Sequence, residues 1–257
     1  MAADPMYRQI ADDLRRQIED GSLAPGQQLR TELELREKYN ASRNTVRDAV
    51  KWLMTRGLVE TRPGQGTFVV QKISPFVTTL TGDPETASGG EGDTYIQEVT
   101  ATFRTPTATP ARVEIQQADN QVGLELQLEA GASVVSRHQA RSIDDTPWSL
   151  QTSFYPMSLV EKGALRLIQA GDIEEGTVAY IKAAIGNTQA GWRDKIIVRA
   201  PDKTETAFFK LPDDGRVSVI ETRRTAFDKE GTPIRLTVSV YPADRNQFAV
   251  YVGRVPK

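Results

Sequence analysis

A short stretch beginning at Ser42 carries side chains well suited to reading another molecule. On a helical wheel its apolar face consists of Val46, Ala49, Val50 and Leu53. Asn44, Arg47 and Lys51 lie more than about 100° from the centre of that face, so they point outward. Arginine can fork onto a guanine edge and asparagine onto an adenine edge, while the Ser42 and Thr45 hydroxyls can help the helix start hold a phosphate. The pattern is typical of a DNA-reading helix, although a solvated surface helix would look similar.

The segments before this stretch predict two further helices with a tight turn between the second and the third. Asp4 is a favoured N-cap, and Pro5 suits the first position of a helix. Thr31 and Glu34 form a predicted capping box that starts the second helix. Asn40 tolerates the left-handed conformation that ends a helix. Three capped helices with one short turn predict a helix-turn-helix.

A predicted hairpin follows these helices. Residues 58–62 and 67–70 read as two short strands, and Pro63-Gly64-Gln65-Gly66 joins them. The glycines would let the backbone approach DNA closely, and Arg62 and Gln65 would supply polar side chains there. Together with the helices, this hairpin predicts a winged helix-turn-helix.

The bulk composition limits the class of protein. A chain of 257 residues is long enough for two domains. It has no cysteine, which excludes disulfides, thiol catalysis and cysteine-ligated metals. The sequence contains neither an apolar run long enough to span a bilayer nor a signal peptide, so we expect a cytoplasmic protein with no membrane partner. The net charge is −2, and basic residues outnumber acidic ones over 42–66, as suits a specific DNA reader.

The rest of the chain predicts a linker and then an α+β domain. The segment TGDPETASGGEGD reads as a linker, so we expect domains over 1–70 and 94–257 joined by 71–93. Strands are expected over 95–103, 133–142, 147–155, 191–199, 216–227, 234–242 and 247–255. Helices are expected over 108–118, 156–169, 176–185 and 203–209. Turn residues at Asp144-Asp145 and over 228–232 join neighbouring strands, which favours an antiparallel sheet.

Residues 6–69 resemble the N-terminal domain of the GntR superfamily of bacterial regulators. The most specific matches are Leu23-Ala24-Pro25-Gly26, Ser42-Arg43-Asn44-Thr45-Val46-Arg47 and Gly57-Leu58-Val59-Glu60 through Gly64-Gln65-Gly66-Thr67-Phe68-Val69. Where the family has Leu-Pro-Ser-Glu, this chain has Leu29-Arg30-Thr31-Glu32, which keeps a capping hydroxyl and adds a cation. The expected DNA contacts are Arg30, Thr31, Ser42, Arg43, Asn44, Thr45, Arg47, Lys51, Arg62, Gly64, Gln65 and Gly66.

The C-terminal part, over about 94–250, resembles the UTRA sensor domain of the HutC subfamily. The matching pieces are Arg141 through Asp144-Asp145-Thr146-Pro147, Ser153-Phe154-Tyr155-Pro156, 224–233 and 239–245. The resemblance implies a fold similar to chorismate lyase, a homodimer formed through this domain, and a small-molecule effector that alters affinity for double-stranded operator DNA. It also implies a repressor more often than an activator.

Two predicted strands of this domain place polar residues on one face. Residues 137, 139 and 141 share a face of one strand, and 149, 151 and 153 share a face of its hairpin partner. In sugar-phosphate-sensing members of the family, contacts fall on an Arg-x-Arg pair and a carboxylate, which map onto Gln139, Arg141 and Gln151 here. The resemblance therefore implies a less charged, carboxylate or peptide-like effector. The expected effector contacts are Arg137, Gln139, Arg141, Gln151, Ser153, Tyr155 and Tyr241.

Other interpretations remain open at this point. Arg141 could instead be a structural ion-pair partner of Asp144 or Asp145. His138 has no neighbour with metal-ligand spacing, so we expect no metal and no cofactor. The C-terminal domain could serve only for dimerisation, without a ligand. An enzyme is the least favoured class, since the sequence shows no nucleophile–base pair, metal set or phosphate loop.

Overall fold

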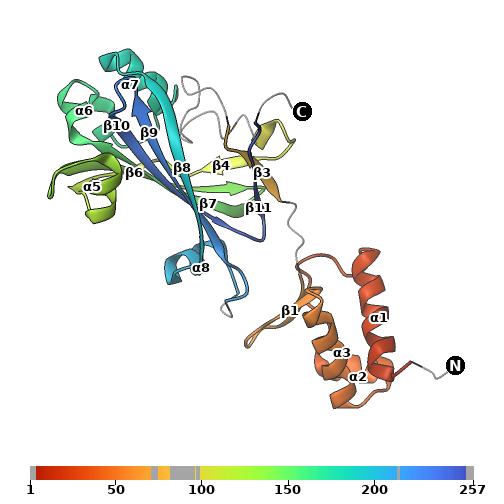
Figure 1. Cartoon of the computed structure of the whole chain (residues 1–257). Helices are drawn as coiled ribbons and strands as arrows, with labels where there is room; N and C mark the ends of the chain where they lie inside the picture. The colour runs from red at the N-terminus through yellow and green to blue at the C-terminus, as the bar shows by residue number, and fades with distance from the viewer. Residues whose placement is uncertain (1–3, 71–74, 82–95, 97–98, 213–214, 253–257) are drawn as a thin grey trace. The chain divides into compact units, whose positions relative to one another are not determined.

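The computed structural model describes residues 4–70, 75–81, 96, 99–212 and 215–252. The chain divides into two compact units, Met1–Ser74 and Pro75–Lys257 (Figure 1). None of the helices among these residues combines the length and the apolar character needed to cross a membrane.

The N-terminal unit is a three-helix cluster followed by a hairpin. Its elements are α1 (Met6–Glu19), α2 (Glu32–Tyr39), α3 (Arg43–Thr55), β1 (Val59–Arg62) and β2 (Gly66–Val69). Ile10 and Leu14 of α1 pack with Val46 and Leu53 of α3 in a buried core. The helical spacing of these apolar residues makes each helix amphipathic. The three helices and the hairpin confirm the predicted winged helix-turn-helix.

The start of α1 differs by one residue from the prediction. Pro5, not Asp4, is the N-cap residue, and no side chain caps this helix. The helix start instead uses backbone contacts, since the Arg8 N–H donates to the Pro5 carbonyl. The other caps are as predicted: Thr31 and Glu34 form the capping box, and Asn40 lies in the left-handed region with φ of 46°.

The C-terminal unit is built on one antiparallel sheet. Its strands follow the order β4-β6-β7-β10-β9-β8, and β5 also pairs with β6. The strands of this sheet are β4 (Pro106–Ala108), β5 (Arg112–Gln117), β6 (Ser133–Ile143), β7 (Thr146–Pro156), β8 (Gln189–Arg199), β9 (Val219–Asp228) and β10 (Pro233–Pro242). Asp144 and Asp145 both have positive φ, as a two-residue hairpin between β6 and β7 requires.

Helices cover both faces of this sheet. They are α5 (Asn120–Leu126), α6 (Met157–Glu161), a 3-10 helix (Leu165–Ile168), α7 (Thr177–Ile185) and α8 (Lys203–Phe209). Leu159 of α6 and Ile181 of α7 pack with Val135 of β6 at one end of one face. Leu126 of α5 and Phe209 of α8 pack against the opposite face, on Leu236 and Val240 respectively. The unit thus has the predicted α+β architecture.

Several segments of this unit differ from the sequence-based expectations. The expected helix over 108–118 is instead β4 and β5, and the expected strand over 95–103 is helical at residues 96, 99 and 100. β5 runs along one side of β6 with mostly exposed side chains, so it lacks the alternating pattern that identifies a half-buried strand. Helix α5, which Asp119 caps, was not expected.

The expected linker over 71–93 contains a strand. β3 (Phe76–Thr79) belongs to the C-terminal unit and pairs in parallel with β11 (Asn246–Ala249). Because its partner lies at the other end of the chain, local sequence could not reveal this pairing. β11 ends at Ala249, earlier than the expected strand over 247–255. The remainder of the expected linker, 71–74 and 82–93, lies outside the described residues.

Candidate nucleic-acid interface and effector site

The hydroxyl groups at the starts of α2 and α3 are engaged in helix caps. The Thr45 N–H donates to Ser42 Oγ at 3.2 Å, and Ser42 Oγ and Thr45 Oγ1 share a hydrogen bond of 2.8 Å. Thr31 Oγ1 donates to Glu34 Oε2 at 2.7 Å. These three predicted DNA contacts therefore set where the helices begin.

The polar face of α3 is exposed, as the helical wheel predicts. The Arg43 and Arg47 side chains are 68% and 65% exposed, respectively. Asn44 and Lys51 are also exposed, whereas Val46 on the opposite face is fully buried. The helix thus presents two guanidinium groups, an amide and an ammonium group in adjacent turns, which is the set that base edges and phosphates require.

The wing carries a cation that its own strands hold. Arg62 donates from Nε and Nη2 to Glu60 Oε1, at 3.0 and 2.9 Å. Its guanidinium also lies 4.3 Å from the centre of the Phe68 ring. Gly64 and Gln65 form the exposed tip, and Gly64 has a φ of 72°, which favours glycine. Arg62 is thus presented in a defined position beside the tip.

Gln28 fixes the wing from outside the hairpin. It forms an isolated antiparallel bridge with Phe68, and its Nε2 donates to the Gln65 carbonyl at 2.8 Å. Gly66 has a φ of 121°, and a Cβ atom there would lie 2.5 Å from Gln28 Nε2. The loop before α2 thus acts as a third strand of the wing. Sequence reasoning missed Gln28 because nothing local signals a pairing with a hairpin so far along the chain.

A groove of about 800 Å³ brings the predicted DNA contacts of the three elements together. The predicted contacts that line it are Arg30, Thr31, Asn44, Arg47, Lys51 and Gly66. Glu32 and Asp48 also line it, so its walls are mixed in charge. The outward face of α3 and the base of the wing therefore form one continuous surface, while Arg43, Arg62 and Gln65 are exposed outside the groove lining.

The C-terminal sheet has its own array of polar side chains on one face. Gln139 of β6 lies opposite Gln151 of β7, which lies opposite Ser239 of β10. Directly opposite residues share a face, so these three side chains form a row across the sheet. They are only 5%, 3% and 4% exposed, respectively. The predicted pairing of 137, 139 and 141 with 153, 151 and 149 is confirmed.

Hydrogen bonds join this row into a network. Arg141 donates from Nη1 to Gln151 Oε1 at 3.0 Å and from Nη2 to Gln139 Oε1 at 3.4 Å. Ser239 Oγ donates to the same oxygen of Gln151 at 3.3 Å. Asp144 is paired with Arg104 at 2.7 Å.

A second row lies next to the first. Ser153 Oγ and Thr237 Oγ1 share a hydrogen bond of 3.0 Å. Sequence reasoning did not include Ser239 or Thr237. Thr237 and Ser239 are two residues apart in the expected strand over 234–242, which indicates that they share one face of it. The pairing of that strand with β7, however, could not be predicted from the sequence.

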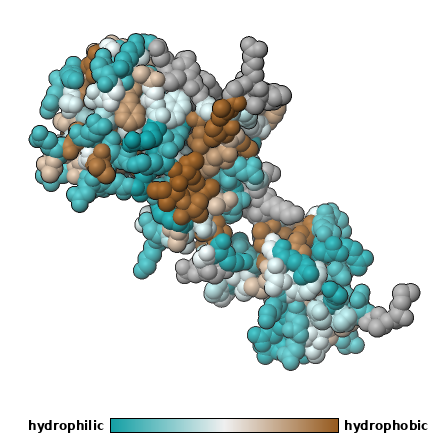
Figure 2. Space-filling view, in the orientation of Figure 1, coloured by the Kyte–Doolittle hydropathy of each residue, from teal (hydrophilic) through white to brown (hydrophobic). Residues whose placement is uncertain are grey.

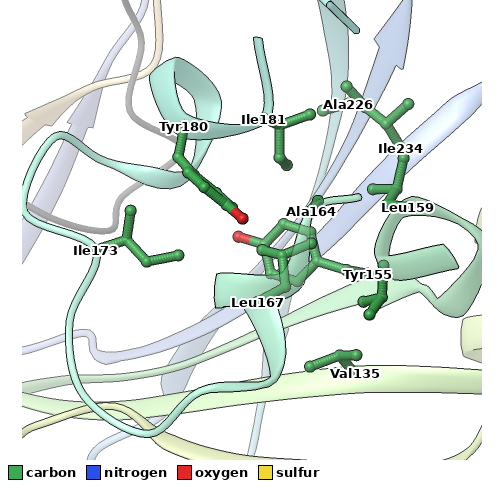
Figure 3. Packing of buried hydrophobic residues seen from close by; sticks show 11 residues of the cluster. Val135, Tyr155, Leu159, Ala164, Leu167, Ile173, Tyr180, Ile181, Ala226 and Ile234 are labelled. Atoms are coloured by element: carbon green, nitrogen blue, oxygen red, sulfur yellow. The ribbon is translucent and has the colours of Figure 1, made fainter. Parts of the chain in front are cut away.

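Three expected effector contacts have structural roles in this unit. Arg137 donates to the carbonyl oxygens of Leu167 and Gln169, both at 3.0 Å, and also to that of Gly171. Tyr155 donates to Thr177 Oγ1 at 2.9 Å, and Figure 3 shows its ring inside the apolar cluster under α7. Tyr241 packs edge-on against Phe248 of β11. The contacts of these three side chains lie within the fold, which disfavours them as effector contacts.

His138 lies on the other face of the sheet from Arg137. Its Nδ1 shares a hydrogen bond of 2.9 Å with Thr152 Oγ1. Burial lowers the pKa of His138, and the nearby Arg112 lowers it further. Across the described ranges, no group of three or more His, Asp or Glu side chains has an arrangement that could hold a metal.

Comparisons with known families agree with both units. The family model described as "Bacterial regulatory proteins, gntR family" matches residues 6–69, and the UTRA domain model matches residues 103–247. The HTH-type transcriptional repressor NagR of Bacillus subtilis is 24% identical over 98% of this chain and 96% of its own length. The mannosyl-D-glycerate transport/metabolism system repressor MngR of Escherichia coli is 30% identical over 62% of each chain.

Solved structures give the same assignment. A GntR-family transcriptional regulator is 26% identical and superposes with a TM-score of 0.61, covering 98% of this chain and 99% of its own. PhnF from Mycobacterium smegmatis, at 22% identity, shares the fold with a TM-score of 0.57 over 95% of this chain and 99% of its own. The chain belongs to the GntR family of bacterial transcriptional regulators, in the HutC group that carries a C-terminal UTRA domain, and it is a DNA-binding regulator rather than an enzyme.

Proposed function

We propose that this regulator binds a pseudo-palindromic operator as a homodimer and that a small molecule bound on the C-terminal sheet changes its operator affinity. The observation that carries the proposal is the pairing, in one chain, of an exposed cationic reading face on α3 with a buried polar array on a sheet. The first suits base edges and the second suits a small hydroxyl-rich molecule. Two relatives are named repressors, which favours repression.

The proposed DNA contacts follow from exposure and position. Arg43, Asn44 and Arg47 would read base edges from the first turns of α3, while Lys51 would bind phosphate. The wing would bring Arg62, with the Gly64–Gly66 tip, to the DNA backbone or the minor groove. Arg30 would add a cation beside the start of α2. The caps at Thr31, Ser42 and Thr45 would orient helix N-termini toward phosphates.

The proposed effector contacts are the hydrogen-bonded residues of the array. Gln139, Arg141, Gln151, Ser153 and Ser239 offer one guanidinium, two amides and two hydroxyls. This set suits a ligand with several hydroxyl groups and at most one negative charge better than a dianionic phosphate, which draws on more cations. Binding would exchange hydrogen bonds within the network for hydrogen bonds to the ligand.

The proposed homodimer uses the apolar surface of the C-terminal unit. Figure 2 shows hydrophobic residues gathered on one side of that unit. Its exposed apolar residues include Ile196 and Val198 of β8, Val77 of β3, and Val250 and Tyr251. β8 is an edge strand, and a patch of this kind on such an edge is typical of a protein–protein contact. A second copy of the chain would also supply the second reading head that a two-fold operator needs.

The test begins with selection of bound duplexes from random DNA by the full-length protein. We expect enrichment of a two-fold sequence whose half-sites lie about one helical turn, ~10 bp, apart. The affinity for that duplex is then measured in fixed salt with and without members of a metabolite panel. Failure to enrich any sequence would overturn the proposed operator binding. Enrichment with no response to any compound would overturn effector control alone.

A ligand-independent regulator is the second candidate. The observation that favours it is that the Arg141, Gln151 and Ser239 side chains already bind one another in a buried network. A thermal shift with the same panel separates the two candidates. Stabilisation of the C-terminal unit by any compound, lost in the Gln151→Ala variant, would support the effector site.

A further inference from the structure

Glu32, the first residue of α2, lies against the reading face of α3. Its Oε1 atom is 2.5 Å from Arg43 Nε, and its Oε2 atom is 4.0 Å from Arg47 Nε. One carboxylate therefore faces two arginines that are four residues apart on the same side of α3. Both arginines are among the proposed base contacts, whereas Glu32 is not.

Both contacts are made at the Nε atom of the guanidinium group. Among the described residues, no hydrogen bond engages the terminal Nη nitrogens of Arg43 or Arg47. A guanine is read by those terminal nitrogens, which fork onto its O6 and N7 atoms. The carboxylate thus contacts each guanidinium at its inner Nε edge, and the contacts found among the described residues leave the terminal nitrogens of both arginines for a base.

The contact has little effect on folding, because it is exposed. The Glu32 side chain is 37% exposed, and those of Arg43 and Arg47 are about two-thirds exposed, at 68% and 65%. Exposed ion pairs contribute little to the stability of a fold. Their effect on binding can be larger, since a long arginine side chain loses rotamer freedom when it binds a base. A carboxylate that already restricts the arginine reduces that loss.

We infer, resting on the proposed operator binding, that Glu32 is a positioning residue that sets sequence specificity by presenting Arg43 and Arg47 to base edges. The negative charge of Glu32 has a second effect, which opposes DNA binding because it repels the phosphates. A carboxylate near the DNA backbone weakens binding to any sequence, because that binding depends on net positive charge. A positioning role and a purely electrostatic role therefore predict different outcomes when the charge is removed.

The test compares Glu32→Gln with Glu37→Gln in the full-length protein. Glu37 is an exposed residue of the same helix, and its replacement removes the same charge without touching α3. Each variant is titrated in fixed salt with the duplex that the wild type enriches and with a scrambled duplex of equal length. Far-UV circular dichroism verifies that both variants fold, as the intact Thr31–Glu34 capping box predicts.

For Glu32→Gln we expect the ratio of enriched to scrambled affinity to fall by about tenfold, while affinity for the scrambled duplex rises or stays equal. Glu37→Gln should leave the ratio unchanged. In an Arg43→Ala, Arg47→Ala background, the effect of Glu32→Gln on the ratio should disappear. The inference would be overturned if Glu32→Gln left this ratio unchanged. It would also be overturned if Glu32→Gln lowered the ratio by the same factor in the Arg43→Ala, Arg47→Ala double variant. Neither result would contradict operator binding. If the wild type enriches no sequence, the proposed function and this inference both fail.

Discussion

The two units use polar side chains in opposite ways. In the N-terminal unit, Arg43 and Arg47 stand exposed on a helix whose other face is buried. In the C-terminal unit, Arg137 and Arg141 are almost fully buried and donate to carbonyl and amide oxygens of the protein itself. Exposed cations are available for a large anionic partner, whereas buried ones need a partner within the fold or a small ligand that enters it.

The difference has a consequence for mutation. Removing an exposed cation that binds DNA should change binding and leave the fold unchanged. Removing a buried cation should mainly lower the stability of the fold. The buried oxygen atoms that accepted its hydrogen bonds would then have neither the arginine nor water as a donor. The same substitution, arginine to alanine, therefore separates the two units.

The largest effect is expected for Arg137→Ala. Arg137 donates to three carbonyl oxygens, one in the 3-10 helix and two in the segment after it, so its loss should destabilise the C-terminal unit by more than about 3 kcal/mol. Urea unfolding followed by fluorescence reports this, because Trp148 and Trp192 belong to that unit. Arg166→Ala is the control: its pair with Glu175 is 40% exposed on the arginine side, so we expect a much smaller loss of stability. Equal losses for the two variants would remove the contrast between buried and exposed cations.

The second effect is expected for Arg47→Ala. This change should weaken binding to the enriched duplex by about 1–3 kcal/mol, with no measurable change in unfolding. The physical reason is the lost pair of hydrogen bonds to one base. A titration in fixed salt measures it. Arg36→Ala removes the same charge from an exposed position on α2 and should reduce affinity for all sequences only slightly. Wild-type affinity in Arg47→Ala would contradict the reading role.

A smaller effect is expected for Gly66→Ala in the wing. The added Cβ would push Gln28 away, which breaks its bond to the Gln65 carbonyl, and the φ of 121° is strained for alanine. Together these should destabilise the N-terminal unit by about 1–2 kcal/mol, read from Trp52 fluorescence. Gly64→Ala has a positive φ but nothing within 4 Å of the added atom, so it should cost less. If Gly64→Ala destabilised the N-terminal unit as much as Gly66→Ala does, the contact with Gln28 would not contribute to its stability.

The same contrast explains what the sequence could predict. The reading face of α3 follows from helix periodicity and a cap at Ser42, both of which lie within a few residues of one another. The array on the sheet needs the register of β7 against β10, which joins residues 88 positions apart, as in the bond between Gln151 and Ser239. For the same reason the hairpin pairing of Gln139 with Gln151 was predicted, whereas Ser239, Gln28 and the β3–β11 pair were not.

The helix over 108–118 was predicted wrongly for a related reason. β5 holds Ile115 exposed at 56%, so its side chains do not alternate between core and solvent. Without that alternation, no local pattern in the sequence indicates a strand here. The pairing with β6 determines the strand, and pairing of this kind is a tertiary effect.

The smallest effect is expected from Glu125, a buried carboxylate of the C-terminal unit. Its side chain is 4% exposed and binds Lys195, Thr225 and Arg193. Burial raises the pKa of Glu125, but hydrogen bonds from Lys195, Thr225 and Arg193 outweigh it, and the net pKa lies below the usual 4.5. A carboxyl with a lowered pKa stabilises the folded state above its unfolded pKa, and this stability is lost as the pH falls through the folded value.

Glu125→Gln should therefore destabilise the C-terminal unit by about 1 kcal/mol at pH 7, since the charged partners are left with a neutral acceptor. The difference from wild type should shrink as the pH is lowered below about 4.5, because the wild-type side chain then becomes neutral as well. Urea unfolding at pH 7 and at successively lower pH values measures this difference. Glu129→Gln, an exposed position beyond the same helix, should show no such dependence. A difference that stays constant with pH would mean that Glu125 acts through its shape rather than its charge.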